Sequence, residues 1–248
     1  MQAMLFAAGL GTRLRPLTND RPKALVEVNG RSLLYRNLDK LLAEGFDKIV
    51  VNVHYFAEEV MAAIEAMPKY KDKVFISDER HKILETGGGL QLARTHFTET
   101  AFLTHNVDIL SDLQLRKGLM DTHRQRREAL ATLATRERKT SRYLLFGPED
   151  QILRGWTNLK TGEVRMARHD IPIAKLSRRA FSGIAAYSTR LFDHLPSGPP
   201  HPFSVVDAWL STAATENIYS YPHDQGRWID VGKMESLRQA ELLFKPNS

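Results

Sequence analysis

The chain contains 248 residues, of which 42% are hydrophobic, and this is enough apolar content to bury the core of one large domain. It contains no cysteine, which excludes disulfide-dependent folds and thiolate metal sites and is compatible with the reducing cytoplasm, where we expect the protein to act. The sequence shows no apolar run long enough for a membrane span and no signal-peptide pattern at the N-terminus, so no membrane partner is expected.

The net charge of +6 is compatible with nucleic acid, an acidic surface or small phosphorylated molecules as partners. The densest basic stretch runs from residue 123 to residue 142, and acidic and apolar residues interrupt it. This pattern is typical of a solvated helix face rather than a nucleic-acid-binding patch. We therefore expect small phosphorylated partners and no nucleic acid.

The first predicted element is a buried parallel strand over residues 2–8, because a short apolar run ends in glycine without polar alternation. Gly9, Gly11 and Thr12 follow, and Arg13 and Lys23 come soon after them. Glycine lets main-chain N–H groups approach an anion, while arginine and lysine neutralise its charge. The stretch predicts a phosphate-binding loop, although it matches neither the dinucleotide fingerprint nor the P-loop pattern.

Strands and helices alternate in the segment that follows. Leucines at helical spacing predict a helix over residues 32–44, which Ser32 caps and Gly45 ends. Further elements are predicted at residues 26–30 (strand and turn), 48–53 (strand), 56–67 (helix) and 74–76 (strand). This βαβα order is typical of a parallel α/β sheet.

Three consecutive glycines, Gly87 to Gly89, open a predicted helix directly after Glu85 and Thr86. Glycines at a helix start leave N–H groups accessible to a ligand and let a planar base lie against the backbone. A flexible turn is the alternative interpretation. The run is therefore a candidate base-binding loop.

A predicted strand over residues 101–108 ends in the carboxylate of Asp108. Open α/β sheets bind ligands at the carboxyl ends of their strands, so we expect Asp108 to share a crevice with both glycine stretches. Carboxylate oxygens suit Mg²⁺, which keeps several waters and uses one or two carboxylates beside substrate phosphates. Asp108 is a candidate metal ligand, with a turn or helix-capping role as the alternative.

Short alternating segments predict β-hairpins in the second half of the chain, at residues 143–146, 151–156 and 158–165. The other elements expected there are a helix at 115–128, strands at 129–135 and 180–187, a proline-rich loop at 195–202, and helices at 204–214 and 233–244. The predicted fold is α/β, a Rossmann-like mixed, mainly parallel sheet flanked by helices, with a small β-rich subdomain.

The string from Gly9 to Leu25 resembles the signature of the sugar-phosphate nucleotidyltransferases, or nucleotide-sugar pyrophosphorylases, which runs Gly-x-Gly-Thr-Arg-Leu-x-Pro-Leu-Thr, then Pro-Lys, then Leu. The Glu-Thr-Gly-Gly-Gly run looks most like the N-acetylmuramate-1-phosphate uridylyltransferase branch, and residues 228–232 match the family's Trp-x-Asp-x-Gly motif. The family usually has glycine where Val107 stands, and its sugar-binding Glu-x-Lys-Pro segment has no clear counterpart here.

The resemblance implies one domain over residues 1–248, with a nucleotide-binding half to about residue 135 and a sugar-binding half, including the C-terminal helix, from about residue 136. It implies Mg²⁺-dependent nucleotidyl transfer from an NTP to a sugar 1-phosphate, with release of pyrophosphate. UTP and N-acetylmuramate 1-phosphate are the first candidates. Glucose, mannose or heptose 1-phosphate with another NTP, and a non-catalytic regulatory homologue, remain open. A monomer or small homo-oligomer is expected.

The same resemblance assigns roles to individual residues. Arg13 and Lys23 would be catalytic, and Asp108 and Asp230 would hold Mg²⁺. The residues expected to bind the nucleotide are Ala7, Ala8, Gly9, Gly11, Thr12, Glu85, Thr86, Gly87, Gly88 and Gly89, and those expected to bind the sugar are Asn106 and Gly183.

Overall fold

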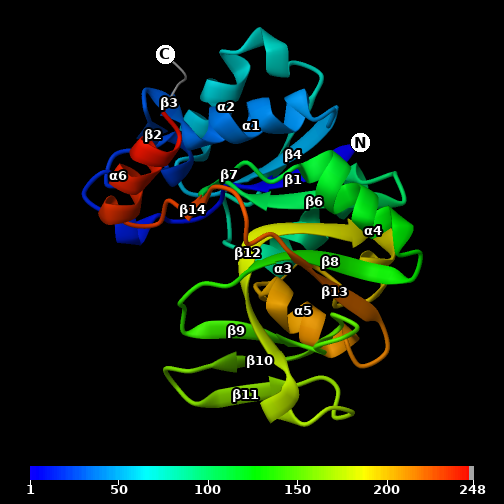
Figure 1. The fold of residues 1–248 in the computed structure, drawn as a ribbon. Coiled ribbons are helices and arrows are strands. Elements are labelled where there is room, and N and C mark those ends of the chain that lie inside the picture. The colour runs from blue at the N-terminus through cyan, green and yellow to red at the C-terminus, as the bar shows by residue number, and fades with distance from the viewer. Residues whose placement is uncertain (246–248) are drawn as a thin grey trace.

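A computed structural model of the chain describes residues 1–245 and shows a ten-stranded mixed sheet with helices on both faces (Figure 1). Its parallel centre consists of β1 (Gln2–Phe6), β4 (Lys48–Val53), β5 (Val74–Asp78) and β6 (Ala101–Asn106). The other strands are β8 (Ala129–Arg136), β9 (Arg142–Phe146), β10 (Leu153–Asn158), β11 (Glu163–Met166), β12 (Ser177–Ser188) and β13 (Asn217–Pro222). The predicted α/β fold is confirmed.

Strand β12 connects the parallel centre to the rest of the sheet. It pairs antiparallel with β6 on one edge and with β8 and β9 on the other. Beyond it, β9, β10 and β11 extend the sheet as the predicted antiparallel, β-rich part, at the bottom of Figure 1. Gly162, at the predicted turn between β10 and β11, has a positive φ of 75°.

The sheet is buried on both faces because two hydrophobic cores lie on opposite sides of it. Ala3 and Leu5 of β1 pack in the core that also holds residues of α1 and α2, whereas Met4 packs with residues of α3 and α5. Burial on both sides explains why this strand is a continuous apolar run. The helices are α1 (Leu33–Ala43), α2 (Ala57–Glu65), α3 (Glu85–Leu92), α4 (Asp121–Gln125), α5 (Val205–Thr212) and α6 (Met234–Leu243). No helix within residues 1–245 has the length and apolar character that crossing a membrane requires.

The ends of α1 agree with the sequence prediction. The Ser32 side chain accepts a hydrogen bond from the Tyr35 backbone N–H at 3.2 Å, and Gly45 follows the helix with φ of 82°. In contrast, the helix predicted over residues 115–128 is a π-helical turn (Leu115–Met120) followed by the short α4. The Gln114 carbonyl accepts from both Gly118 and Leu119, and Gly118 leaves room for the Tyr221 hydroxyl, which lies 2.9 Å from the position a Cβ would take.

Two small sheets were not anticipated as paired strands: β2 (Glu27–Val28) with β3 (Arg31–Ser32), and β7 (Ile109–Ser111) with β14 (Trp228–Asp230). The second pair brings the end of the chain back to its first half. Helix α6 follows β14 and lies beside β2 and β3 in Figure 1, where the Asn29 amide donates to the carbonyls of Glu241 and Phe244. The C-terminal helix, grouped by sequence with the sugar-binding half, therefore covers the first half.

Candidate active site

A cavity of about 410 Å³ lies at the carboxyl ends of the central parallel strands. Loops from both halves of the chain form its wall: the segments after β1, β5 and β6, and Gly232 after β14. The residues predicted from sequence that line this cavity are Ala8, Gly9, Gly11, Thr12, Arg13, Lys23, Glu85, Thr86, Asn106 and Asp108. The carboxyl edge of a parallel sheet is where such folds bind ligands.

The phosphate loop after β1 owes its shape to Gly11. This residue has φ of 64°, and its carbonyl accepts hydrogen bonds from the Leu14 N–H at 2.9 Å and the Thr18 hydroxyl at 2.8 Å. A Cβ at Gly11 would lie 3.0 Å from Cβ of Lys23, so glycine lets the loop cross directly over this lysine. Gly9 is exposed, and no atom lies within 4 Å of the position a Cβ would take there.

The two predicted cations approach the cavity from different segments. Lys23 begins a 3₁₀ turn (Lys23–Leu25) directly after Pro22, is only 9% exposed, and forms an ion pair with Asp108. Arg13 lies over Gly232, since a Cβ at that glycine would be 2.9 Å from the Arg13 guanidinium and 2.7 Å from Oδ1 of Asp230. The two cations thus face the two carboxylates.

The β7–β14 pairing places the two carboxylates together. Ile109 pairs with Asp230, and the Val231 N–H donates to the Asp108 carbonyl at 2.8 Å. Val107, which stands where the family usually has glycine, is 4% exposed, and its backbone bonds to Phe6 and Asn37. The branched side chain is therefore accommodated in the turn that carries Asp108.

Asp230 has features of a cation ligand. Its Oδ1 is buried and has no hydrogen-bond partner within residues 1–245. Burial raises the pKa of its carboxyl above the ordinary value, and the negative charge of Asp108 raises this pKa further, against the lowering effect of Lys23, Arg13 and Arg138. A divalent cation between the two carboxylates would relieve both the burial cost and the repulsion, so the residues fit Mg²⁺.

The structure places the second glycine run differently from the prediction. Glu85 and Thr86 line the cavity, whereas Gly87 to Gly89 lie inside α3 and are not among the lining residues. The N–H of Gly87 donates to the Phe203 carbonyl at 2.9 Å. It is therefore engaged by the 201–203 loop and is not free for a base, so any contact of these three glycines with the base remains a prediction.

The two residues predicted to bind the sugar lie close together. Asn106 lines the cavity at the end of β6. Gly183, on β12, has φ of 79°, and a Cβ there would lie 3.1 Å from the Asn106 amide nitrogen and 2.7 Å from Ile109. Gly183 thus makes room for the side chains of Asn106 and Ile109. It is not itself a residue that lines the cavity.

Among the residues that line the cavity and were not predicted are two with polar side chains, Asn52 and Glu79. The Asn52 amide oxygen accepts from the Ala7 N–H at 2.7 Å, and its nitrogen donates to Glu79 at 2.7 Å. Burial raises the pKa of the Glu79 carboxyl, whereas hydrogen bonds from Asn52 and the Leu84 N–H lower it. The signal in the sequence was Asn52 itself, a polar residue near the end of the otherwise apolar β4. A buried amide at this place must find hydrogen-bond partners.

Histidine does not contribute to a metal site in the described part of the chain. No group of three or more His, Cys, Asp or Glu side chains that could hold a metal occurs within residues 1–245. His105 is buried beside the site, and burial lowers its pKa to about 4. It is therefore neutral near pH 7.

The chain is similar in sequence to known proteins. The nucleotidyl transferase family model matches residues 2–151. The chain is 33% identical to the N-acetylmuramate alpha-1-phosphate uridylyltransferase of Caulobacter vibrioides, over 96% of this chain and 95% of that one. It is 28% identical to the enzyme of the same name from Neisseria meningitidis, over 98% of both chains.

Solved structures share the fold. A putative glucose-1-phosphate thymidylyltransferase from Bacillus anthracis superposes with a TM-score of 0.78 at 16% identity, covering 100% of this chain and 97% of that one. HddC from Yersinia pseudotuberculosis, complexed with GMP-PN, gives 0.75 at 21% identity, covering 98% and 99%. The chain belongs to the nucleotidyl transferase family, that of the sugar-phosphate nucleotidyltransferases its motifs resemble.

Proposed function

We propose that the protein transfers a uridylyl group from UTP to N-acetylmuramate 1-phosphate, giving the UDP-sugar and pyrophosphate in a reaction that requires Mg²⁺. The observation that carries the proposal is that Arg13, Lys23 and Asp108 line one cavity, with the buried carboxylate of Asp230 beside Arg13 and Asp108. Relatives with this substrate in their names align over nearly the whole chain and support the choice of sugar and nucleotide.

The chemistry needs two anions to be held together while charge moves to a leaving pyrophosphate. A phosphate oxygen of the sugar phosphate attacks the α-phosphorus of the nucleotide, and the bond to the β-phosphate oxygen breaks. Arg13, at the phosphate loop, would bind the β- and γ-phosphates and neutralise the pyrophosphate as it leaves. Lys23 would lie between the α-phosphate and the sugar phosphate as a compact charge. Positioning of this kind supplies much of the rate in phosphoryl transfer.

Asp108 and Asp230 would hold Mg²⁺, which when bound supplies charge neutralisation at the reacting phosphates. In the structure Lys23 is paired with Asp108. Binding of phosphates would give Lys23 a second anionic partner and leave the Asp108 carboxylate available. The protein's own residues thus account for the binding and neutralisation that the transfer needs.

The test is a release assay for pyrophosphate with the purified full chain and Mg²⁺. Each of the four common NTPs is combined with the 1-phosphates of N-acetylmuramate, glucose, mannose and heptose. The expected result is turnover with UTP and N-acetylmuramate 1-phosphate, abolished by chelation of the metal. Turnover with another pair would replace the substrate assignment, and no turnover with any pair would favour a non-catalytic binding protein.

A further inference from the structure

A second hollow, of about 270 Å³, lies in the β-rich part of the sheet and contains two arginines, Arg138 and Arg178. Neither arginine forms an ion pair within residues 1–245, whereas Glu137 in the same hollow is already paired with Arg179 at 3.2 Å. Tyr143 and Leu159 complete the wall. The hollow therefore offers positive charge that the described part of the protein does not use.

Arg138 is held in place without a carboxylate partner. Its guanidinium stacks on the Trp228 ring, 5.0 Å from the ring centre, and one terminal nitrogen donates to the Phe181 carbonyl at 3.3 Å. Its Nε is buried and has no hydrogen-bond partner in the described part of the chain. Buried donors are normally satisfied, and the described residues supply no acceptor to this nitrogen.

The backbone around Arg138 is fixed by Tyr143. The Tyr143 hydroxyl donates to the Arg138 carbonyl at 3.1 Å and accepts from the Thr140 N–H at 3.1 Å. These bonds close the turn between β8 and β9. With its backbone held in this turn and its guanidinium stacked on Trp228, Arg138 is preorganised, which lowers the entropy lost when it binds an anion.

Arg138 connects the hollow to the active site, because it stacks on Trp228 of β14, the strand that carries Asp230. Trp228 and Asp230 are two residues apart on this strand, so their side chains share one face and stand about 7 Å apart. Burial lowers the pKa of Arg138 and the negative charge of Asp230 raises it, which agrees with their closeness. The spacing of about 7 Å between the Trp228 and Asp230 side chains is about the length of a sugar ring with its substituents.

We propose that Arg138, stacked on Trp228, binds the carboxylate of an acidic substituent on the sugar 1-phosphate, with Arg178 adding positive charge at the same hollow. This inference rests on the proposed function and names the group that distinguishes its substrate. N-acetylmuramate is N-acetylglucosamine with a lactyl ether that ends in a carboxylate, so the two sugar 1-phosphates differ only in the group that Arg138 would bind. A guanidinium can bind such a carboxylate through two parallel hydrogen bonds.

The experiment compares kcat/KM for these two sugar 1-phosphates, with UTP and Mg²⁺, in the wild type and in Arg138→Gln. Glutamine removes the charge but keeps an amide donor near the position of the arginine Nε. The ratio of kcat/KM for N-acetylmuramate over N-acetylglucosamine 1-phosphate should fall about 10- to 100-fold in the variant, the usual effect of losing a hydrogen bond to a charged group. The fall should appear in KM for the sugar phosphate, and Arg138→Lys should restore part of it.

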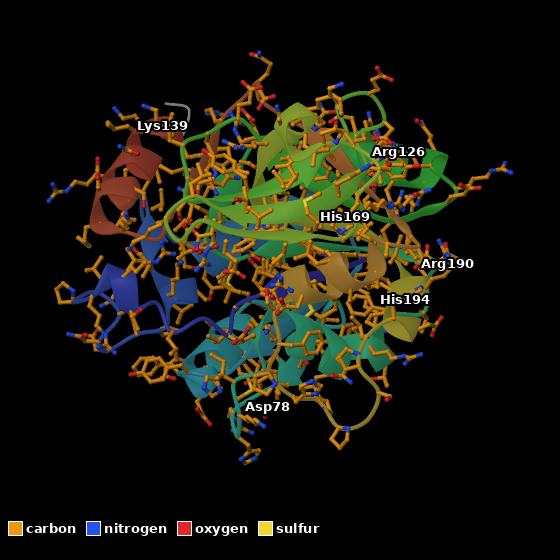
Figure 2. All side chains as sticks on the ribbon, turned by 90° about the horizontal axis from the view of Figure 1, so that it is seen from below. Asp78, Arg126, Lys139, His169, Arg190 and His194 are labelled. Atoms are coloured by element: carbon orange, nitrogen blue, oxygen red, sulfur yellow. The ribbon has the colours of Figure 1, made fainter. Side chains whose placement is uncertain are left out.

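Lys139→Gln is the matched control, because it removes the same charge from the next residue. Lys139 is exposed and lies at the edge of the molecule in Figure 2, so its variant should keep the wild-type ratio. An equal loss on both sugars in Arg138→Gln would assign Arg138 a purely structural role and overturn the inference. Equal kcat/KM values of the wild type for the two sugar 1-phosphates would also overturn the inference, whereas the proposed nucleotidyl transfer would then stand. Turnover with neither sugar would overturn the inference together with the proposed substrate.

Discussion

The two glycine-rich stretches of the chain, residues 9–11 and 87–89, use glycine for different physical reasons. At Gly9 no atom lies within 4 Å of a Cβ position, and the residue is exposed at the cavity. At Gly88 a Cβ would lie 2.2 Å from the His201 carbonyl oxygen, and at Gly87 2.3 Å from the Phe203 ring. Space at Gly9 is open toward the cavity, whereas space at Gly87 and Gly88 is filled by the protein.

From this difference we expect the first stretch to serve ligand binding and the second to serve packing. The first stretch lines the cavity together with Arg13, Lys23 and Asp108, so changes there should alter rate or substrate binding more than folding. The second stretch joins α3 to the loop before α5, through Gly87 and through the Thr86 hydroxyl, which accepts from the Val205 N–H at 3.0 Å. Changes there should alter folding first.

The largest effect is expected at the charged groups beside the first stretch. Lys23→Ala or Asp108→Asn should lower kcat by about 10²- to 10³-fold or more, which is the usual loss when a preorganised charge stabiliser is removed. Steady-state pyrophosphate release measures the effect, and circular dichroism confirms the fold. A folded variant with near wild-type turnover would remove the ion pair from the mechanism.

The next effect tests the packing role of the second stretch. Gly88→Ala should reduce the free energy of unfolding by about 1–3 kcal/mol, because the added methyl must displace the backbone at His201. Alanine is the better helix former by about 1 kcal/mol, so a loss of stability despite this gain would mark the clash. Urea unfolding gives the value. An unchanged or more stable variant would mean that the 201–203 loop moves away without cost.

Gly9→Ala provides the opposite case at the first stretch. The unfolding free energy should stay within about 0.5 kcal/mol of the wild type, because the methyl meets no atom and φ is not positive. The methyl would enter space left for the triphosphate, so KM for the NTP should rise about tenfold, about 1.4 kcal/mol. Unfolding and kinetics on the same preparation measure both, and a large stability loss with unchanged KM would reverse the assignment of the two stretches.

The smallest effect concerns pH and Glu79, whose Oε1 lies 2.5 Å from the position a Cβ would take at Gly89. Because burial raises the pKa of this carboxyl in the folded state, its contribution to stability is full below the ordinary value of 4.5 and is lost as the pH rises through the raised pKa. Glutamine does not titrate. The stability of Glu79→Gln relative to wild type should therefore increase between pH 4.5 and pH 7.5, as measured by urea unfolding in steps of pH. A constant difference across this range would show that Glu79 keeps its ordinary pKa.

Much of the fold could be predicted because it depends on local pattern. The apolar run of β1, the capped α1 and the alternation of strands and helices follow from burial on one or both faces, which leaves a period in the sequence. The phosphate loop was equally visible, since Gly9, Gly11 and two cations stand close together along the chain. In these regions the residues that interact are neighbours in the sequence.

Other features depend on contacts between residues that are far apart in the chain. The three-residue strands β7 and β14 carry no period of their own, yet their pairing brings Asp230 beside Asp108 and Trp228 beneath Arg138. The partners of Gly88 and of Asn52 likewise lie in other segments. The sequence by itself determined the parallel α/β elements and a candidate anion-binding loop. Only the tertiary structure decided which glycines line the cavity and which are packed against other segments, and which aromatic ring lies against Arg138, because long-range packing sets what occupies the space around each side chain.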